Sequence, residues 1–519
     1  MKAMLLTLVL VGYWMLYGCG ERAHNPIDLE HPDINGDISY EDISVDILEP
    51  TYFTESLVKL KDELVFVKVK DRTSGEIKNF FAIGYDSHSN GPWDGVSGKN
   101  QCYRDAKGKA HGFYDNAEEL NLLAAESGAN FVYVWSGEEK LSTSPKLYGR
   151  WLEQYNNMDP KVWRSIPIIY NGAGEVDMDP NRDEAINSLR ERFRRFKFRI
   201  GEYSREMQPL MPSYEEMPWF SWHPTWRIIG TGDGRGEMTS DEQADAFAQS
   251  TTMMIGDNYT YVENRFDEEL NPITGQKGKK GEDYDYWLSI DDPDHRSYFS
   301  AAWDMIYSAR RRSLGDKAAD PSVGTVVWAW IQGHAFNDDI GRSICFNGTS
   351  GLWAAGKFPT KEYLRKEITS TIAAGGTGII FFGYFYCRRP EADVIRSFFK
   401  ALSNPEIYEG VLISPEMDLG YDTKFLGEVG YDGRGRAHIM VKWYKKNKTI
   451  YLIGSNPGAR ATTFSLNFPF SIEKAYLYNW DAAEFFETEE IRIHDRKVTY
   501  TIPRDDGVII KLKPLHKSR

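Results

Sequence analysis

The segment Thr377–Tyr386 constrains the fold more than any other part of the chain. It contains four consecutive apolar residues, followed by a glycine and further aromatics, and it lacks the polar alternation of a half-exposed strand. This pattern predicts a fully buried parallel strand. The preceding segment, Glu362–Ala374, is predicted to be a helix, and Gly375-Gly376 supplies the left-handed residue on which many helices end. We therefore expect an α/β fold with a parallel sheet.

The same alternation of strand, loop and helix runs from Phe80 to Phe399. Further predicted strands are Phe80–Asp86, Asn130–Trp135, Ile166–Asn171, Thr252–Thr260 and Gly324–Gln332. Helices are predicted to begin near Asp115, Asp179, Thr239 and Tyr298. We count Ile166–Asn171 as the third strand. The segments 218–223 and 226–233 are predicted to be either two strands or a loop and one strand. This organisation predicts a (β/α)8 TIM barrel, in which the strand C-termini form the floor of the active site.

Two flanking regions differ from this pattern. Leu64–Val69 and Ile77–Phe80 predict a β-hairpin before the barrel. After Asn404, short strands with turns every eight to twelve residues predict a small all-β sandwich domain. The expected divisions are 1–19 for a signal peptide, 20–75 for a tether and hairpin, 76–403 for the barrel and 404–519 for the sandwich.

The N-terminus predicts export. Met1-Lys2 precedes an apolar run, Ala3–Leu16, of the length found in secretory signals and short for a membrane span. The next residues, Leu16-Tyr17-Gly18-Cys19, resemble a bacterial lipobox, which implies lipidation of Cys19. We expect a lipid-anchored protein of the cell envelope that meets the membrane through this anchor alone. The alternative is a plain signal peptide with an incidental cysteine.

Composition narrows the partners and cofactors. A formal net charge of −14 disfavours nucleic acid as a general partner. The three other cysteines, Cys102, Cys345 and Cys387, cannot all pair, which excludes a disulfide scaffold and leaves a Cys345–Cys387 pair open. No CxxC or HExxH motif occurs, and the ten histidines have no metal-ligand spacing. We expect neither a metal nor another cofactor.

Three strand segments carry a resemblance to a known class of enzyme: Phe81–Gly84, Ile255–Tyr259 and Ala373–Gly383. They read like strands one, six and eight of (β/α)8-barrel glycoside hydrolases, and with the C-terminal sandwich the chain resembles the lipoprotein members of glycan-degrading Gram-negative bacteria. The resemblance implies a carbohydrate substrate. Many such barrels carry Asn-Glu after strand four and a nucleophilic Glu after strand seven. This chain has no Asn-Glu dipeptide, and Gln332 ends the seventh predicted strand.

Glycoside hydrolysis requires two carboxyl groups, one protonated and one ionised. Their separation is about 5–5.5 Å in retaining enzymes and about 6.5–9.5 Å in inverting ones. Glu175, in Gly-Ala-Gly-Glu after a predicted strand, and Asp257, in Ile-Gly-Asp-Asn-Tyr, are the leading catalytic pair. Asp233, in a glycine-rich run, is the reserve. Each carboxylate also has a structural alternative. Glu175 could be a loop residue salt-bridged to a following arginine, Asp257 could bond to neighbouring backbone or to an arginine, and Asp233 could lie in a flexible turn.

Residues expected to bind substrate lie at the predicted strand ends. Aromatic rings stack on the C–H faces of sugars, and each such contact contributes about 0.5–1.5 kcal/mol if it resembles a favourable ring pair. The candidates are Asp86, Trp93, Trp135, His223, Trp330, Gln332, His334, Asp338, Trp353, Tyr384 and Tyr386. Each aromatic residue has core packing as its alternative, and each histidine a structural role.

The function predicted from these features is hydrolysis of a complex poly- or oligosaccharide by paired carboxylates. A degenerate barrel that binds glycan without cleaving it is the main alternative, because the usual carboxylates after strands four and seven are missing. A lyase or transglycosylase on the same fold is the third reading.

Overall fold

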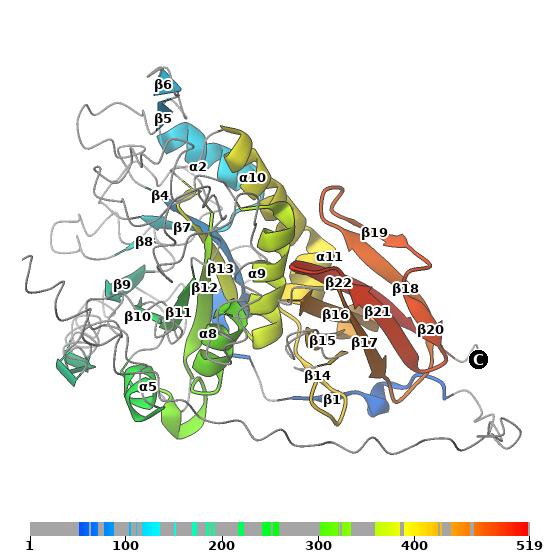
Figure 1. The fold of residues 1–519 in the computed structure, drawn as a ribbon. Helices are drawn as coiled ribbons and strands as arrows, with labels where there is room; N and C mark the ends of the chain where they lie inside the picture. Colours follow the sequence, from blue (N-terminus) through cyan, green and yellow to red (C-terminus); the bar gives the residue numbers. More distant parts are fainter. Residues whose placement is uncertain are drawn as a thin grey trace, which may run out of the picture. The chain divides into compact units, whose positions relative to one another are not determined.

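Parallel strands form the largest sheet in the described part of the protein, which we describe from a computed structural model (Figure 1). Its eight strands are β4 (Ala82–Ser87), β7 (Phe131–Val134), β8 (Arg150–Trp151), β9 (Ile169–Ala173), β10 (Glu216–Trp222), β11 (Met253–Asn258), β12 (Val326–Gln332) and β13 (Gly378–Phe382). The structure describes residues 51–61, 64–70, 77–87, 103–104, 110–111, 117–134, 150–151, 169–173, 183–184, 186–187, 190–191, 216–222, 241–250, 253–258, 301–319, 321, 324–333, 359–384, 389–423, 426–427, 437–456 and 461–516.

The strand order follows the chain. Neighbours in the sheet run β7-β4-β13-β12-β11-β10-β9-β8, and every pair is parallel. Each strand from β8 to β13 therefore lies beside its successor, and the last strand, β13, pairs with the first, β4. The two strands at the ends of this order, β7 and β8, are also in contact. The predicted mixed α/β fold with a parallel sheet is confirmed.

One strand changes the predicted count. The structure contains β8, only two residues long, between β7 and β9 in chain order. The strand counted as third from the sequence, Ile166–Asn171, corresponds to β9 and is therefore the fourth, and β10 is the fifth. A two-residue strand is too short to carry a hydrophobic period, which is why the sequence did not reveal it. The other segment considered there, 226–233, lies outside the described residues.

Helices predicted near Asp115, Thr239, Tyr298 and Glu362 are present, and the one predicted to begin near Asp179 lies largely outside the described residues. The α-helices include α2 (Ala117–Glu126), α5 (Asp241–Ala248), α8 (Ala301–Arg310), α9 (Lys361–Ala374), α10 (Arg389–Ser403) and the short α11 (Pro405–Ile407). Helix α9 begins where the Thr360 hydroxyl accepts a hydrogen bond from the Tyr363 amide at 3.2 Å. It ends at Gly375, whose φ of 98° is the left-handed cap predicted from the sequence.

The two faces of the parallel sheet have different neighbours. Ile83 and Tyr85 of β4 belong to a cluster with residues of α2, α9 and α10, so they mark the helix-covered face. On the other face the Phe131 and Trp328 rings meet edge to face, with centroids 5.0 Å apart. A Cβ on Gly378 would lie 2.6 Å from the Trp328 ring, so glycine makes room for this indole. Large rings thus fill the middle of the face turned away from the helices.

The C-terminal part forms two antiparallel sheets, in agreement with the predicted short strands. The five-stranded sheet has the order β15-β16-β22-β18-β19 and the three-stranded sheet the order β17-β21-β20. A hydrophobic cluster that includes Ile439, Leu452, Phe464, Tyr500 and Ile510 lies between them. Their strands are β15 (His438–Tyr444), β16 (Thr449–Asn456), β17 (Thr462–Asn467), β18 (Ile472–Asn479), β19 (Glu484–Glu487), β20 (Arg492–His494), β21 (Lys497–Ile502) and β22 (Asp506–Pro514).

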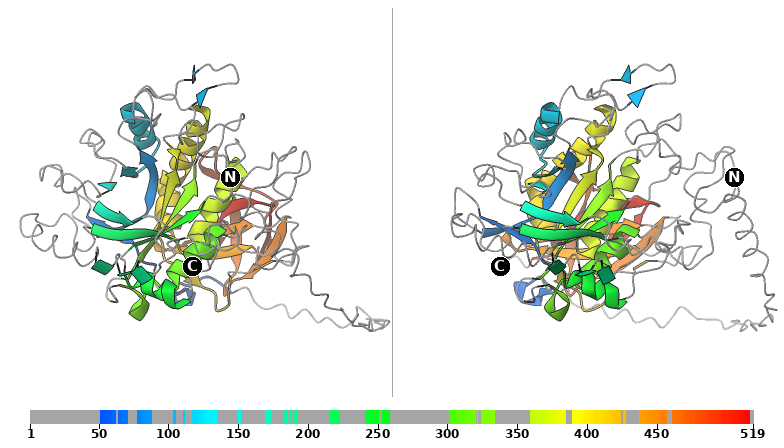
Figure 2. Two further views of the ribbon diagram at one scale, coloured as in Figure 1. Left: turned by 60° about the vertical axis from the view of Figure 1, so that its left-hand side comes forward. Right: turned by 90° about the vertical axis from the view of Figure 1, so that its left-hand side faces the viewer.

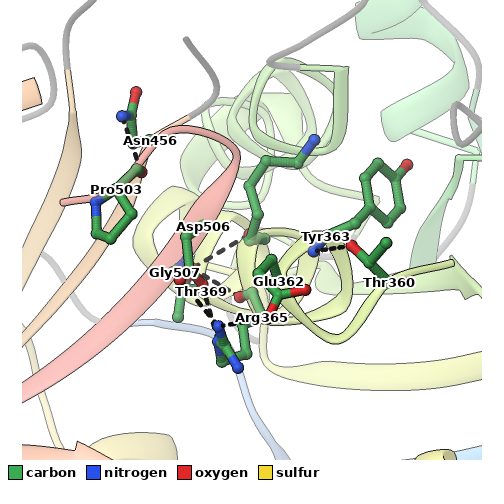
Figure 3. A network of polar contacts seen from close by, with 10 residues as sticks. Thr360, Glu362, Tyr363, Arg365, Thr369, Asn456, Pro503, Asp506 and Gly507 are labelled. Carbon is green, nitrogen blue, oxygen red and sulfur yellow. Dashed lines mark hydrogen bonds and ion pairs between the residues drawn. The ribbon is translucent and has the colours of Figure 1, made fainter. Parts of the chain in front are cut away.

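Helix α9 lies between the parallel sheet and the five-stranded sheet, as Figures 1 and 2 show. It contacts α8 and β12 on one side and β15, β16 and β22 on the other. Figure 3 shows polar contacts across this interface, among them the Arg365–Asp506 ion pair. Beside it, a Cβ on Gly507 would lie 2.1 Å from the Thr369 hydroxyl oxygen. It would also lie 2.4 Å from the Arg365 carbonyl oxygen, so the α9 backbone leaves no room for a larger residue at position 507.

A buried lysine adds to the same interface. The Lys366 ammonium lies 2.8 Å from an Asp505 oxygen and 3.4 Å from a Glu367 oxygen, and 4.1 Å from the centre of the Tyr363 ring. Burial alone would lower the pKa of Lys366, but the carboxylates of Asp505 and Glu367 reverse the effect and raise it above its usual range. The C-terminal sheet is thus joined to α9 by ion pairs as well as by apolar packing.

Shorter elements complete the described part of the chain. The predicted hairpin is present as β2 (Val67–Lys70) and β3 (Ile77–Phe80), paired antiparallel. The remaining elements are η1 (Glu55–Leu57), β1 (Lys59–Leu60), β5 (Tyr103–Arg104), β6 (Ala110–His111), η7 (Gly315–Lys317), the π-helical turn η9 (Tyr408–Leu412), β14 (Met417–Asp418) and η10 (Lys445–Asn447). None of the helices in the described residues is both long and apolar enough to cross a membrane.

Candidate functional site

The carboxyl ends of four neighbouring strands bring together several residues predicted from the sequence. In the sheet, β4, β13, β12 and β11 lie side by side. Asp86, Phe382, Gln332 and Asp257 are the last or second-to-last residues of these four strands. Because parallel strands end at one edge of a sheet, all four positions lie along the same edge. Three of them, Asp86, Gln332 and Asp257, are predicted site residues.

The strand register shows which residues of neighbouring strands lie opposite these positions. Asp257 pairs with Trp330, and Gln332 pairs with Phe382. Asp86 pairs with Tyr133 of β7. The backbones of Asp86 and Asp257 lie in strands β4 and β11. For these two residues the prediction that their carboxyl groups act on a substrate stays a prediction.

An aromatic pair stands at the centre of this edge. The rings of Trp330 and Phe382 are stacked, with centroids 5.1 Å apart and an interplanar angle of 18°. Trp330 is 2% exposed, whereas Phe382 is partly exposed. The Gly333 amide donates a hydrogen bond to the Phe382 carbonyl at 2.8 Å, which ties the ends of β12 and β13 together. Neither ring belongs to the clusters on the helix-covered face.

Gln332 is the polar residue of this edge whose side chain is described. It is 1% exposed and ends β12. An amide has both donor and acceptor groups, but this one is buried, so its predicted role in substrate binding stays a prediction. It cannot serve as the nucleophile or the general acid of a glycosidase. The structure therefore agrees with the sequence in placing an amide at the end of the seventh strand.

Tyr384, which follows β13, lies on the helix-covered face of the sheet, opposite to the Trp330 and Phe382 rings. Its ring is fully buried and packs against Tyr85 and Phe399, with centroids 4.9 Å and 5.7 Å away. The Tyr384 hydroxyl accepts a hydrogen bond from Arg396 of α10 at 3.2 Å. These are contacts of a core residue near the sheet edge. Its predicted role as a ring that stacks on a sugar stays a prediction, which would require the ring to become exposed.

The other predicted residues lie outside the described part of the chain. They are Cys19, Trp93, Trp135, Glu175, His223, Asp233, His334, Asp338, Trp353 and Tyr386, and the cysteines Cys102, Cys345 and Cys387 lie there too. The chain positions of three are informative, because Glu175 follows the end of β9 at Ala173, and Trp135 and His223 directly follow β7 and β10. Among the described residues, no group of three or more His, Cys, Asp or Glu is arranged to hold a metal ion.

Phe382 was not singled out from the sequence. It belongs to a run of apolar residues, so its local pattern says only that the strand is buried. The register between β12 and β13 is what places it beside Trp330. The alternation of side chains along a strand was the available signal. It requires Phe381 and Phe382 to face opposite sides of the sheet, so one of the two had to lie on the face without helices.

Comparisons with known proteins give a mixed result. No protein-family model matches the chain, and no curated protein sequence matches it. Similar solved structures include a family 51 arabinofuranosidase from Xanthomonas axonopodis pv. citri, with 8% identity, a TM-score of 0.42 and coverage of 89% of this chain and 99% of that one. A family 51 α-L-arabinofuranosidase from Bifidobacterium longum has 8% identity, a TM-score of 0.41 and coverage of 90% and 99%.

A third similar structure is a family 27 β-L-arabinopyranosidase from Geobacillus stearothermophilus, in complex with arabinose. It has 9% identity, a TM-score of 0.38 and coverage of 84% of this chain and 97% of that one. All three are glycoside hydrolases. TM-scores of this size do not establish a common fold, and identities this low do not establish a common activity.

Proposed function

We propose that this protein is a glycoside hydrolase that acts on a poly- or oligosaccharide without a metal or other cofactor. In this proposal the parallel strands close into a (β/α)8 barrel. The strand order supports closure, because the last strand pairs with the first and the end strands β7 and β8 are in contact. The substrate lies over the carboxyl ends of the strands, where Asp86, Phe382, Gln332 and Asp257 gather.

The relative position of β9 and β11 is the observation that carries this proposal. The two strands flank β10, so their ends are separated by two strand spacings, about 10 Å. Glu175 follows β9, now the fourth strand, and Asp257 lies in β11. The two catalytic carboxyl groups of glycosidases lie ~5–9.5 Å apart, a separation of the same order as this strand spacing. We therefore assign Glu175 and Asp257 as the catalytic pair, with Asp233 as the reserve.

The proposed division of labour follows from general acid–base chemistry. One carboxyl must be protonated to donate a proton to the leaving oxygen, and the other must be ionised to attack the sugar or activate water. Gln332 orients a hydroxyl group of the substrate, and the Phe382 ring offers a partly exposed aromatic surface beside it. Trp93, Trp135, His223, His334, Asp338, Trp353 and Tyr386 are proposed to line the same mouth from the adjoining loops.

The proposed location is the cell envelope. Export through the N-terminal signal and lipidation at Cys19 would leave the rest of the chain attached to a membrane by the polar segment from residue 20 to about residue 45. The barrel and the C-terminal sandwich, 76–403 and 404–519, would then meet glycans outside the cytoplasm.

Product analysis by mass spectrometry tests the proposal. The purified chain, in mild detergent, is incubated with a panel of plant and microbial glycans. Hydrolysis predicts saccharides whose masses include one added water, and their loss in Glu175→Gln and in Asp257→Asn. The control is Glu473→Gln, an exposed carboxylate on β18. Products that persist in both catalytic variants would refute the assigned pair.

A glycan-binding protein is the second candidate, and the amide at Gln332 favours it. If the wild-type chain binds a glycan of the panel but releases no product, and Gln332→Ala weakens that binding, the parallel sheet is a capture site. Unsaturated, ultraviolet-absorbing products would instead identify a lyase.

A further inference from the structure

A surface of lysines and aromatic rings lies on the five-stranded sheet, whereas the candidate site lies on the parallel sheet. We call it the Tyr476 face: Lys474 and Tyr476 of β18, Phe485 and Glu487 of β19, and Lys511 and Lys513 of β22, with Glu487 directly opposite Tyr476 in the strand register. The neighbours of Tyr476 along β18, Ala475 and Leu477, belong to the apolar cluster between the two sheets. Since side chains alternate along a strand, Tyr476 faces the opposite side.

Two ammonium groups of β22 lie near the Tyr476 ring. The Lys513 Nζ lies 5.3 Å from the ring centre and the Lys511 Nζ lies 5.5 Å from it. Lys511 is also 5.1 Å from the centre of the Phe485 ring. Tyr476 and Phe485 are partly exposed, and Lys513 is exposed. The surface thus presents aromatic carbon next to positive charge.

The positive charges are not fully balanced by carboxylates. Lys511 is 2.6 Å from an oxygen of Glu406, and Lys474 is 3.5 Å from an oxygen of Glu487. Among the described residues, no carboxylate is found within ion-pair distance of Lys513. It stands directly opposite Lys474 in the β18–β22 register, an arrangement in which like charges disfavour the folded state. An added anion would relieve that repulsion.

We propose that the Tyr476 face binds a carboxylated saccharide. The sugar carboxylate accepts hydrogen bonds from the Lys513 and Lys474 ammonium groups, and an apolar face of the sugar ring packs on Tyr476. Lysine suits this role because its ammonium presents three rotatable donors. Long polyanions such as nucleic acids fit less well, since a chain with a net charge of −14 repels them beyond this small surface. The proposal is independent of hydrolysis at the parallel sheet.

Isothermal titration calorimetry on the full chain in detergent tests the proposal. The probes are hexagalacturonate and a neutral galactose hexasaccharide, in about 50 mM salt, where surface ion pairs are weakly screened. We expect saturable binding of hexagalacturonate that Lys513→Glu and Tyr476→Ala each weaken at least tenfold. The matched control is Lys497→Glu, an exposed lysine on β21 of the three-stranded sheet, which should leave the affinity unchanged within a factor of two.

Three outcomes would overturn the proposal. The first is the absence of saturable hexagalacturonate binding by the wild-type chain. The second is equal weakening by Lys513→Glu and Lys497→Glu, which would mean that net charge alone governs binding. The third is binding that is lost in Asp257→Asn but unchanged in Lys513→Glu, which would place the ligand at the parallel sheet. The hydrolytic activity of the Lys513→Glu variant is measured separately. Because Lys513 is not part of the proposed hydrolase site, a loss of hexagalacturonate binding with unchanged hydrolysis concerns the Tyr476 face alone.

Discussion

Arg365 and Asp506 join helix α9 to strand β22 through two parallel hydrogen bonds, from Nε to Oδ1 at 2.8 Å and from Nη2 to Oδ2 at 2.9 Å. Asp506 also accepts a hydrogen bond from the Gly507 amide at 2.7 Å. Burial raises the pKa of Asp506, while Arg365 and the amide act against that shift. The pair matters most for Asp506, whose charge would be left buried without a cation if Arg365 were removed, whereas Arg365 also pairs with Glu362 at 3.2 Å.

Arg365→Ala should lower the free energy of unfolding by about 3 kcal/mol at pH 7, since it leaves the Asp506 carboxylate buried and unpaired. The deficit should shrink toward pH 4, because protonation removes the unpaired charge. Urea titrations at the two pH values measure both effects. Lys361→Ala is the control: it removes an exposed ion pair to Asp481 and should cost less than about 1 kcal/mol. Equal losses in the two variants would contradict the special role of the Arg365 pair.

Gly507→Ala should destabilise the protein by at least about 1–3 kcal/mol, the usual range for overpacking. The new Cβ would lie 2.1 Å from the Thr369 hydroxyl oxygen and 2.4 Å from the Arg365 carbonyl oxygen. Because the second contact is with backbone, adding Thr369→Ala should restore less than half of the loss. Thermal unfolding of the single and double variants measures this, and full rescue by Thr369→Ala would show that the backbone contact does not matter.

Lys442 provides a pH-dependent prediction. Burial lowers its pKa from near 10.5 to about 7, although Glu416 opposes the shift, and the ammonium donates a hydrogen bond to the Ser414 carbonyl at 2.9 Å. A lysine whose pKa is depressed in the folded state contributes stability above its unfolded pKa, and this is lost as pH falls from about 10.5 through about 7. Between pH 7.5 and 9.5 the wild type should therefore gain about 2 kcal/mol relative to Lys442→Met.

Chemical denaturation at both pH values checks this expectation. The comparison with Lys442→Met cancels the titration of all other groups. Lys445→Met, at an exposed position beyond β15, should follow the wild type across the same range. A parallel course of wild type and Lys442→Met would mean that the buried ammonium is not titrating in this window.

Phe381 and Phe382 are adjacent residues on opposite faces of the sheet and should respond differently to the same substitution. Phe381 is fully buried against Phe398 and Phe399 of α10, so Phe381→Ala should cost about 3–5 kcal/mol of stability. Phe382→Ala should cost less stability but reduce glycan affinity or kcat/KM about tenfold, corresponding to ~1.4 kcal/mol. Melting curves and kinetics on both variants distinguish the effects. Unchanged kinetics in Phe382→Ala would remove this ring from the proposed site.

Local sequence patterns predicted much of the secondary structure, because the signals involved span only a few residues. The left-handed cap at Gly375, the apolar strand that follows it and the hairpin ending at Phe80 were all expected and are present. Strand β8 was missed, because Arg150–Trp151 is too short for a period to be visible.

Contacts between distant segments depended on the tertiary structure. Arg365 and Asp506 are 141 residues apart, and nothing in either local sequence indicates that they meet. The same holds for the Trp330–Phe382 stack, which follows from the register of two parallel strands. The sequence by itself determined which segments become strands and helices and which residue types end them, since turn, cap and hydrophobic period are short-range properties. Only the tertiary structure decided which strand ends lie together and which charges are buried as pairs, since these depend on chain segments that are brought together by packing.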